Sequence, residues 1–354
     1  MELSIKKILD EAIRRGASDV HISTDKPAMV RVDDDLIAYQ KNYILSDDDT
    51  RNLVNQLMDE NQKKLFENNK EVDFAYNFDD KARFRTNIFI QRGSCAAALR
   101  LVPKDIKSIE ELELPEILKE FTNKQQGLFL AVGPAGHGKS TTIASMIDLI
   151  NSSRSEHIIT IEDPIEYIFT QDKSIINQRE VFADTLSFKR ALRSALRQDP
   201  DVLFVGEMRD LETISTALTI AETGHLVFST LHTNNASETI DRMIDVFPPH
   251  QQEQIRFQIA SSLLGIISQR LIPRKDGGRI PATEILMANT AIRNTIREGK
   301  TYQIVNSIQT GSSEGMMTLD SSLVDLVRKN KINKEDAIFY SSDKSFIEKS
   351  LAGN

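Results

Sequence analysis

Residues Gly133-Pro-Ala-Gly-His-Gly-Lys-Ser140 decide the fold of this chain. They match the phosphate-binding loop pattern G-x-x-x-x-G-K-[ST] at every fixed position. An apolar run, 128–132, leads into the loop, and a helix-compatible run, 140–150, follows it. Because the order strand, loop, helix separates a true phosphate-binding loop from a chance match, we expect a nucleotide to bind here.

The residue types of the loop suit the phosphates of ATP. Glycines let successive backbone N–H groups point at phosphate oxygens, and the following helix adds its positive N-terminal end. Lys139 would place a charge on the β- and γ-phosphates, and the Ser140 hydroxyl would ligate Mg²⁺. His137 fills a variable position of the loop, where the backbone N–H is the group that acts. The simplest interpretation of its side chain is that the loop tolerates it without using it. The predicted ATP-binding residues are Gly133, Pro134, Ala135, Gly136, His137, Gly138, Lys139, Ser140 and Thr141.

Composition narrows the class of protein. The 354 residues suffice for two domains, and a net charge of −8 disfavours a nucleic-acid partner, which would require a basic surface. No apolar run approaches the roughly 20 residues that span a bilayer, and the N-terminus lacks a signal-peptide core. The single cysteine, Cys95, excludes an intrachain disulfide and a multi-cysteine zinc site. We therefore expect a cytoplasmic protein that reaches a membrane only through a partner.

Residues 1–103 are predicted to form a small α+β domain, and the charged stretch 104–113 is predicted to be a linker. Apolar periodicity indicates two helices, 4–15 and 50–66, the first of which presents Ile5, Ile8, Leu9, Ala12 and Ile13 on one face. A turn is expected at 33–35. The predicted strands are 19–23, 28–32, 72–78, 82–91 and 95–102.

From residue 114 to residue 354 helices alternate with apolar strands, which predicts an α/β domain with a parallel sheet. The strand at 157–162 comes between the loop strand and an acidic strand, as it does in RecA-like ATPases. The part from about 236 to 354 is expected to be mostly helical, with turns at Pro248-Pro249, Pro273 and Gly277-Gly278. The predicted strands of the sheet are 128–132, 157–162, 202–206 and 226–231.

Two strands end in carboxylates. Glu162 and Asp163 close the strand 157–162, and Glu207 lies just past the strand 202–206. Ligands collect at the carboxyl ends of parallel strands, so these groups should lie beside the phosphate loop. We assign Glu207 to Mg²⁺ and water ordering, as in a Walker B acid, and Glu162 to the general base. The two roles could be exchanged.

Two histidines bracket the strand 226–231. His225 and His232 are separated by roughly 23 Å of extended chain, so both cannot touch one phosphate. His232 is at the carboxyl end and is the better candidate for sensing the γ-phosphate, although Thr230 and Thr233 could also do so. His225 is more simply explained as ordering a turn or a subunit contact.

The N-terminal domain carries a basic stretch. Between Lys81 and Lys104 there are six basic residues and no acidic one. A period of two places Arg83 and Arg85 on one face of a strand. Arginines presented by a separate domain suit the charge of a phosphoryl transition state, which is the arginine-finger role. The alternative is a solvated basic face with salt bridges inside the domain.

Together these features resemble the secretion-type ATPases of type II and type IV pilus systems. The family's Walker A, Asp, Walker B and His boxes correspond to 133–141, 160–167, 201–210 and 223–233. The chain is most similar to the pilus-retraction branch: it starts directly at a short PAS-like domain and lacks the tetracysteine zinc site of extension ATPases. The stretches 291–298 and 315–320 resemble the C-terminal signatures of that branch. His137 and Thr295 depart from the family pattern, which usually has a small residue and leucine there.

The resemblance implies a homohexameric ring whose N-terminal domain closes over ATP and Mg²⁺. It places Arg85, Arg92 and Arg100 in the stretch that holds the family's arginine fingers. It also implies docking to an inner-membrane platform protein of the pilus machine. The function expected is therefore an ATP-driven motor for pilus retraction and twitching motility, with catalytic groups on Lys139, Glu162, Glu207, His232 and these arginines.

Three other functions remain open at this point. A pilus-extension or type II secretion ATPase is disfavoured by the single cysteine. A regulatory module that binds nucleotide without hydrolysing it is disfavoured by the presence of both Glu162 and Glu207. A nucleic-acid translocase is disfavoured by the acidic net charge.

Overall fold

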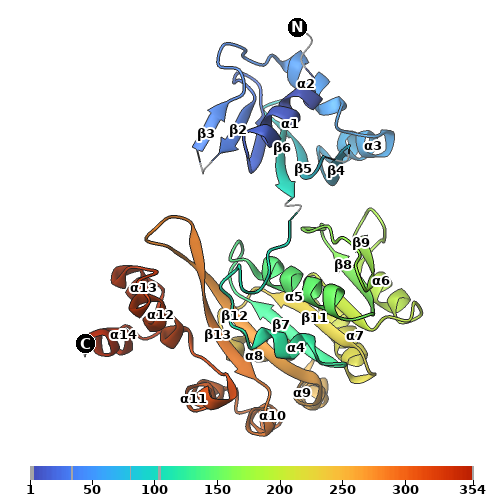
Figure 1. Cartoon of the computed structure of the whole chain (residues 1–354). Coiled ribbons are helices and arrows are strands. Elements are labelled where there is room, and N and C mark those ends of the chain that lie inside the picture. The colour runs from blue at the N-terminus through green and yellow to red at the C-terminus, as the bar shows by residue number, and fades with distance from the viewer. Residues whose placement is uncertain (1–3, 33–34, 80, 103–104, 353–354) are drawn as a thin grey trace. The chain divides into compact units, whose positions relative to one another are not determined.

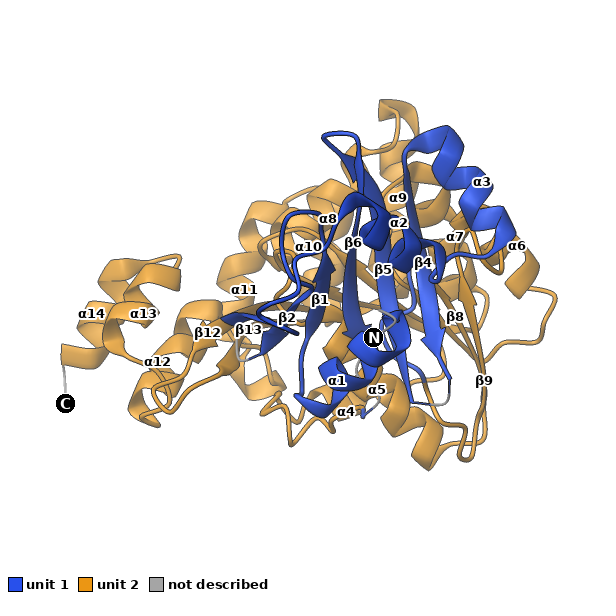
Figure 2. Ribbon diagram, turned by 90° about the horizontal axis from the view of Figure 1, so that it is seen from above, with its two compact units in different colours: residues 1–105, 164–168 blue, residues 106–163, 169–354 orange. Residues whose placement is uncertain are grey.

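The chain divides into two compact units (Figures 1 and 2). Each unit has a hydrophobic core of its own. The computed structural model describes residues 4–32, 35–79, 81–102 and 105–352. The first unit is Met1–Asp105 with Pro164–Ile168, and the second is Ile106–Asp163 with Phe169–Asn354. The domain boundary and linker start predicted at 103 and 104 lie outside the described residues, as does most of the turn predicted at 33–35. Among the residues described, no helix has the length and apolar character needed to cross a membrane.

The first unit is an antiparallel sheet covered by helices, which confirms the α+β expectation. Its strand order is β3-β2-β1-β6-β5-β4. Helix α1 buries the face predicted for it, since Ile5, Ile8, Leu9 and Ala12 are all at most 1% exposed. The elements are α1 (Ile5–Arg14), β1 (Asp19–Ile22), β2 (Met29–Val32), β3 (Asp35–Ala38), α2 (Asp47–Asn55), α3 (Glu60–Asn69), β4 (Glu71–Phe78), β5 (Ala82–Gln91) and β6 (Ser94–Val102).

The single helix predicted over 50–66 is wrong, because the chain forms two helices there. Asp59 starts α3, and its carboxylate accepts hydrogen bonds from the backbone N–H groups of Asn61 and Gln62. The side chain of Gln62 in turn accepts from the N–H of Asp59, which completes a capping box. This local pairing satisfies the orphan donors of a new helix start, and the apolar periodicity alone does not reveal it.

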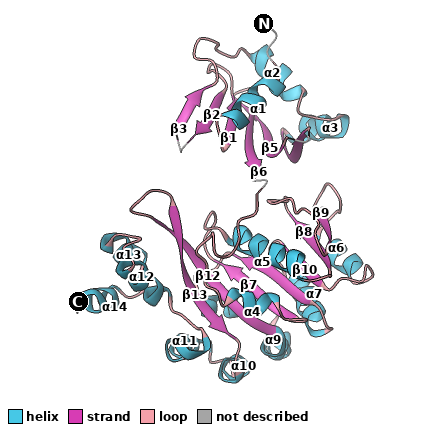
Figure 3. Ribbon diagram, viewed as in Figure 1, coloured by secondary structure: helices cyan, strands magenta, loops and turns pink. Residues whose placement is uncertain are grey.

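The second unit is built on a seven-stranded sheet of order β13-β12-β7-β11-β10-β8-β9 (Figure 3). All neighbours are parallel except β12 and β13. Its first elements are α4 (Leu118–Thr122), β7 (Gly127–Val132), α5 (Lys139–Ser153), β8 (His157–Glu162), β9 (Ile175–Glu180), α6 (Phe188–Ala195), β10 (Val202–Val205), α7 (Leu211–Glu222) and β11 (Leu226–Leu231). The rest are α8 (Ala236–Asp245), α9 (Pro249–Ser262), β12 (Leu263–Pro273), β13 (Arg279–Met287), α10 (Thr290–Arg297), the 3₁₀ turns η1 (Thr301–Gln303) and η2 (Ser312–Glu314), α11 (Ile304–Thr310), α12 (Leu319–Arg328), α13 (Lys334–Tyr340) and α14 (Lys344–Ala352).

The strand order confirms the RecA-like α/β class. The strand inserted between the loop strand β7 and the acidic strand β10 is β11, and not the strand at 157–162 (β8), which lies on the other side of β10. All four strands predicted from the sequence are present. Three strands of this unit were not predicted, β9, β12 and β13, and neither was β3 in the first unit. Strand β9 is a polar edge strand, and β12 with β13 forms a long hairpin within the stretch expected to be mostly helical. The hairpin turns at Gly277-Gly278, one of the turns predicted there, where both residues have positive φ.

The two C-terminal signature stretches belong to the core of the second unit. On α10, Ile292 and Ile296 are fully buried, and the Arg293 guanidinium donates to backbone carbonyls at the end of α9. Thr318 caps α12, and the Asp320 carboxylate accepts from two backbone N–H groups before α14. These stretches therefore hold the C-terminal helices against the sheet.

Candidate active site

The phosphate-binding loop joins β7 to α5. Its backbone has left-handed φ values at Gly133 (142°), Gly136 (77°) and Gly138 (82°), a region that only glycine enters without strain. Gly138 stands at the N-cap of α5, so the helix begins directly under the loop. The three glycines are therefore required by the backbone path, and the helix begins at the loop where a phosphate is expected to bind.

Lys139 crosses the loop from the first turn of α5. Its side chain is buried, and Nζ donates hydrogen bonds of 2.9 Å to the carbonyl oxygens of Gly133 and Pro134. A buried ammonium is costly unless polar partners surround it. The loop carbonyls supply such partners, and they hold the charge where the β- and γ-phosphates are expected.

His232 follows the last residue of β11 and lies next to Lys139. The ring Nδ1 is 3.4 Å from Lys139 Nζ. Burial lowers the pKa of His232, the charge of Lys139 lowers it further, and Glu207 acts in the opposite direction. The neutral ring is therefore favoured, and it can accept a hydrogen bond from the ammonium.

Glu207 lies just past β10 and completes a row with these two residues. Its Oε2 is 3.6 Å from His232 Nε2, and its Oε1 is 2.7 Å from Arg209 Nε. The row Lys139–His232–Glu207 thus joins the phosphate loop to the carboxyl ends of β11 and β10. Sequence reasoning predicted all three residues for the site, and the structure brings them together.

Glu162 ends β8 and is only 5% exposed. Its Oε1 accepts a 2.6 Å hydrogen bond from Thr160 Oγ1 and lies 3.5 Å from Gln178 Nε2. A methyl group on Gly206 would lie 3.3 Å from the Glu162 Cα, so the ends of β8 and β10 pack closely. Glu162 and Glu207 therefore occupy neighbouring strand ends.

Thr160 and Gln178 position Glu162, and sequence reasoning missed both. Thr160 interrupts the apolar residues 158–161 just before Glu162 in β8, which was an available signal. Gln178 lies on β9, a strand whose mixed sequence gave no period of two.

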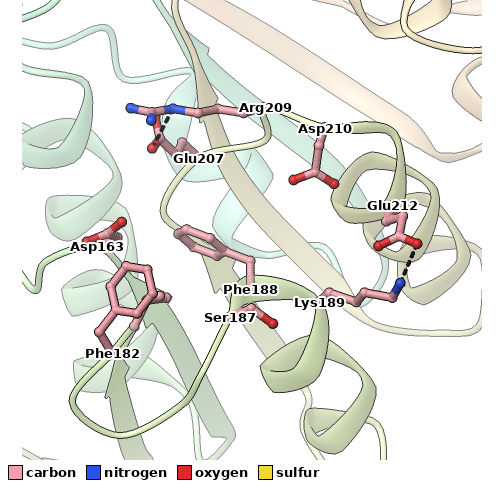
Figure 4. Close-up of a pocket in the computed structure, with 10 residues that line it drawn as sticks. Asp163, Phe182, Ser187, Phe188, Lys189, Glu207, Arg209, Asp210 and Glu212 are labelled. Atoms are coloured by element: carbon pink, nitrogen blue, oxygen red, sulfur yellow. Dashed lines mark hydrogen bonds and ion pairs between the residues drawn. The ribbon is translucent and has the colours of Figure 1, made fainter.

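A cavity of about 360 Å³ opens beside Glu207 (Figure 4). Phe182 and Phe188 form apolar walls, and Asp163 lies in the same cavity as Glu207. This gives water and ligands access to the Glu207 carboxylate from the side of Asp163. The remaining lining residues are Val181, Ser187, Lys189, Arg209, Asp210 and Glu212.

His225 lies at the opposite end of β11 and has a different environment. Its Nδ1 is 3.1 Å from the carbonyl oxygen of Ile220 and 3.4 Å from Thr223 Oγ1. These contacts fix the turn between α7 and β11, which agrees with the turn-ordering role considered for it.

In the first unit, Arg85 and Arg100 are directly opposite each other on β5 and β6. Both are exposed, so their side chains share one face of the sheet. Arg100 Nε donates a 2.9 Å hydrogen bond to Asp19 on the neighbouring strand β1. The two arginines are therefore cross-strand neighbours, and Arg100 makes the kind of salt bridge inside the domain that was the alternative to the finger role.

Arg92 lies elsewhere in the same unit, at the turn between β5 and β6. It adopts a left-handed φ of 50° next to Gly93, as a tight hairpin turn demands. Seven residues of extended strand separate Arg92 from Arg85, which corresponds to roughly 23 Å. The three predicted fingers therefore form a pair and a separate single residue, and they cannot all reach one phosphate.

A protein-family model described as "Type II/IV secretion system protein" matches residues 1–278. This chain belongs to that family. Among the relatives of this secretion-family chain is the "Type IV pilus retractation ATPase PilT" of Pseudomonas aeruginosa, which is 47% identical over 335 residues, covering 95% of the chain and 97% of the relative. The "Twitching motility protein" of Neisseria gonorrhoeae is 49% identical over 294 residues, covering 83% and 79%. The resemblance predicted from the sequence is confirmed.

A solved structure shares the whole fold. The crystal structure of "the Pilus Retraction Motor PilT and Bound ADP" superposes with a TM-score of 0.92 at 50% identity and covers 98% of this chain and 100% of its own. As its name states, that crystal structure contains bound ADP.

We predict that His232→Ala lowers kcat for ATP on the order of a hundred-fold, because a polar group aimed at the phosphates is lost. His225→Ala is the matched control at the other end of β11. It should leave kcat within about two-fold and lower the free energy of unfolding by about 1 kcal/mol through a lost hydrogen bond. Steady-state ATPase assays and denaturant unfolding measure both. Equal losses of kcat in the two variants would remove His232 from the site.

Proposed function

We propose that this chain is an ATP-hydrolysing motor that powers type IV pilus retraction, and through it twitching motility. The observation that carries the proposal is the row Lys139–His232–Glu207 beside the phosphate loop, with Glu162 at the adjoining strand end. Relatives named for pilus retraction and twitching support the cellular role. Two carboxylates next to a complete loop favour hydrolysis over a purely regulatory function.

The residues suit hydrolysis of the γ-phosphate. A water oxygen attacks the γ-phosphorus, the bond to the bridging oxygen of ADP breaks, and the water proton passes to Glu162. Lys139 compensates charge on the phosphates, and the buried position of Glu162 limits access of bulk water to the base. Ser140 at the start of α5 and Glu207 would hold Mg²⁺, Glu207 partly through water, and the ion would supply further charge compensation.

The first unit would supply the remaining positive charge. Arg85 and Arg100 act together on the transition state when the two domains close around the nucleotide, and Arg92 acts at a different place. Closing and opening about the segment near 103–113 would convert hydrolysis into motion. We further propose that six copies form a ring in the cytoplasm, and that the ring transmits this motion to an inner-membrane platform protein of the pilus machine.

We predict that Lys139→Ala abolishes ATP turnover and pilus shortening, because the loop loses its only charge on the phosphates. Lys173→Ala is the control, since this exposed lysine of the same unit lies outside the site. The variants should be compared as purified proteins and in bacteria that lack their own retraction ATPase. Turnover by Lys139→Ala at the wild-type rate would defeat the site assignment. Wild-type turnover without restored shortening would reject retraction and retain the ATPase.

We predict that Arg85→Ala and Arg100→Ala each lower kcat by roughly a thousand-fold, and that the double variant is no worse than either single one. The reason is that two adjacent guanidinium groups stabilise one developing charge as a unit. In a double variant of Arg85 and Arg92, the fold losses of kcat should multiply, because these two residues lie far apart and act independently. Single-turnover ATP hydrolysis measures the three single variants and the Arg85/Arg100 and Arg85/Arg92 double variants. Independent effects of Arg85 and Arg100 would contradict the pairing.

A further inference from the structure

The phosphate loop is fastened from the side by β12, a strand that contributes nothing to the motif. Strand β12 runs parallel to β7 with Ser268 opposite Val132, so Gln269 lies where the loop begins. Gln269 is 2% exposed. Its Nε2 donates 2.8 Å to the His137 carbonyl, and its Oε1 accepts 2.7 Å from Thr142 Oγ1 on α5. One side chain thus bridges the loop and the helix that follows it.

The fit between loop and strand leaves no spare room. A Cβ atom at Gly133 would stand 2.3 Å from the Gln269 carbonyl oxygen, and one at Gly138 would stand 2.8 Å from Gln269 Nε2. Such approaches are possible only because both loop residues lack a side chain. Gln269 therefore contacts the loop near its start and near its end.

The imidazole of His137 makes the third attachment. Its Nδ1 accepts a 2.9 Å hydrogen bond from the backbone N–H of Leu271, two residues along β12 from Gln269. A neutral ring that accepts at Nδ1 carries its proton on Nε2. Neither this bond nor the one to Gln269 uses the backbone N–H of His137. That backbone N–H is the group that a phosphate loop turns toward its ligand.

We propose that Gln269 and the His137 side chain are positioning residues that hold the phosphate loop in its nucleotide-binding conformation. They act on the nucleotide through the loop. Because they hold the loop in place before the nucleotide binds, they reduce the conformational entropy that the loop loses on binding. The inference rests on the nucleotide binding proposed above and on no part of the retraction role.

Charged neighbours of His137 favour the form of the ring that this contact needs. Burial lowers the pKa of His137, and the positive charges of Arg270 on β12, Arg279 on β13 and Lys139 on α5 lower it further. The ring is therefore neutral near pH 7. The attachment is complete above the ordinary histidine pKa of about 6.5, and it is lost as the pH falls through the lowered value of the folded protein.

The test is the dissociation constant of a fluorescent ADP analogue for the full chain, measured without hydrolysis. His137→Ala and Gln269→Ala should each weaken binding roughly three- to ten-fold, the effect of about one hydrogen bond. His137→Asn should stay within about two-fold of the wild type, because the amide oxygen replaces Nδ1 as acceptor. His137 is half-exposed, so its variants should fold, and thermal unfolding checks this.

The pH profile separates positioning from a general structural role. Between pH 7.5 and the acid limit of folding, the wild type should lose affinity relative to His137→Asn and approach His137→Ala. Equal affinities of wild type, His137→Ala and His137→Asn at every pH would overturn the proposal. Failure of the wild type to bind the analogue at all would instead remove the proposed nucleotide site.

Discussion

The buried positive charge of Lys139 is the constraint on which the site depends. An ammonium that is 6% exposed needs polar partners on several sides, and here two loop carbonyls and the His232 ring lie within hydrogen-bonding reach. These contacts tie the ammonium to the phosphate loop and to the end of β11. Phosphate binding would therefore depend on the positions of the loop and of the end of β11. Through His232 it would also depend on the position of Glu207.

The order of strands turns that local constraint into a complete site. The loop strand β7 lies between β12 and β11. On one side β12 presents Gln269 and the Leu271 N–H to the loop, and on the other β11 ends at His232. The next strands, β10 and β8, end at Glu207 and Glu162. Because the sheet interior is buried on both sides, these strand ends cannot shift independently, and each polar residue is held in place by the packing of the apolar residues before it.

The sequence predicted the groups that perform chemistry better than the groups that support them. Lys139 is identified by the phosphate-loop motif, whereas Glu207 and His232 come just after apolar strands, and the rule that ligands collect at carboxyl strand ends places them beside the loop. Gln178 and Gln269 lie on strands without a clear period of two, so their positions follow only from the sheet order. The break before Asp59 depends on one capping box, which apolar periodicity does not register. The sequence does not reveal the contact of the His137 side chain, because its partner, the Leu271 N–H, is 134 residues away in the chain.

The central claim, that this chain is a hydrolysing ring motor whose base is Glu162, is tested most directly by Mg²⁺-dependent ATP hydrolysis. The purified wild type and Glu162→Gln are assayed side by side, with the oligomer size recorded in the same buffer. The account predicts turnover by a wild-type hexamer and loss of turnover in an equally hexameric variant. Undiminished hydrolysis by Glu162→Gln would contradict the assignment of the base. Tight ATP binding with negligible wild-type turnover would contradict a motor that works without its platform partner.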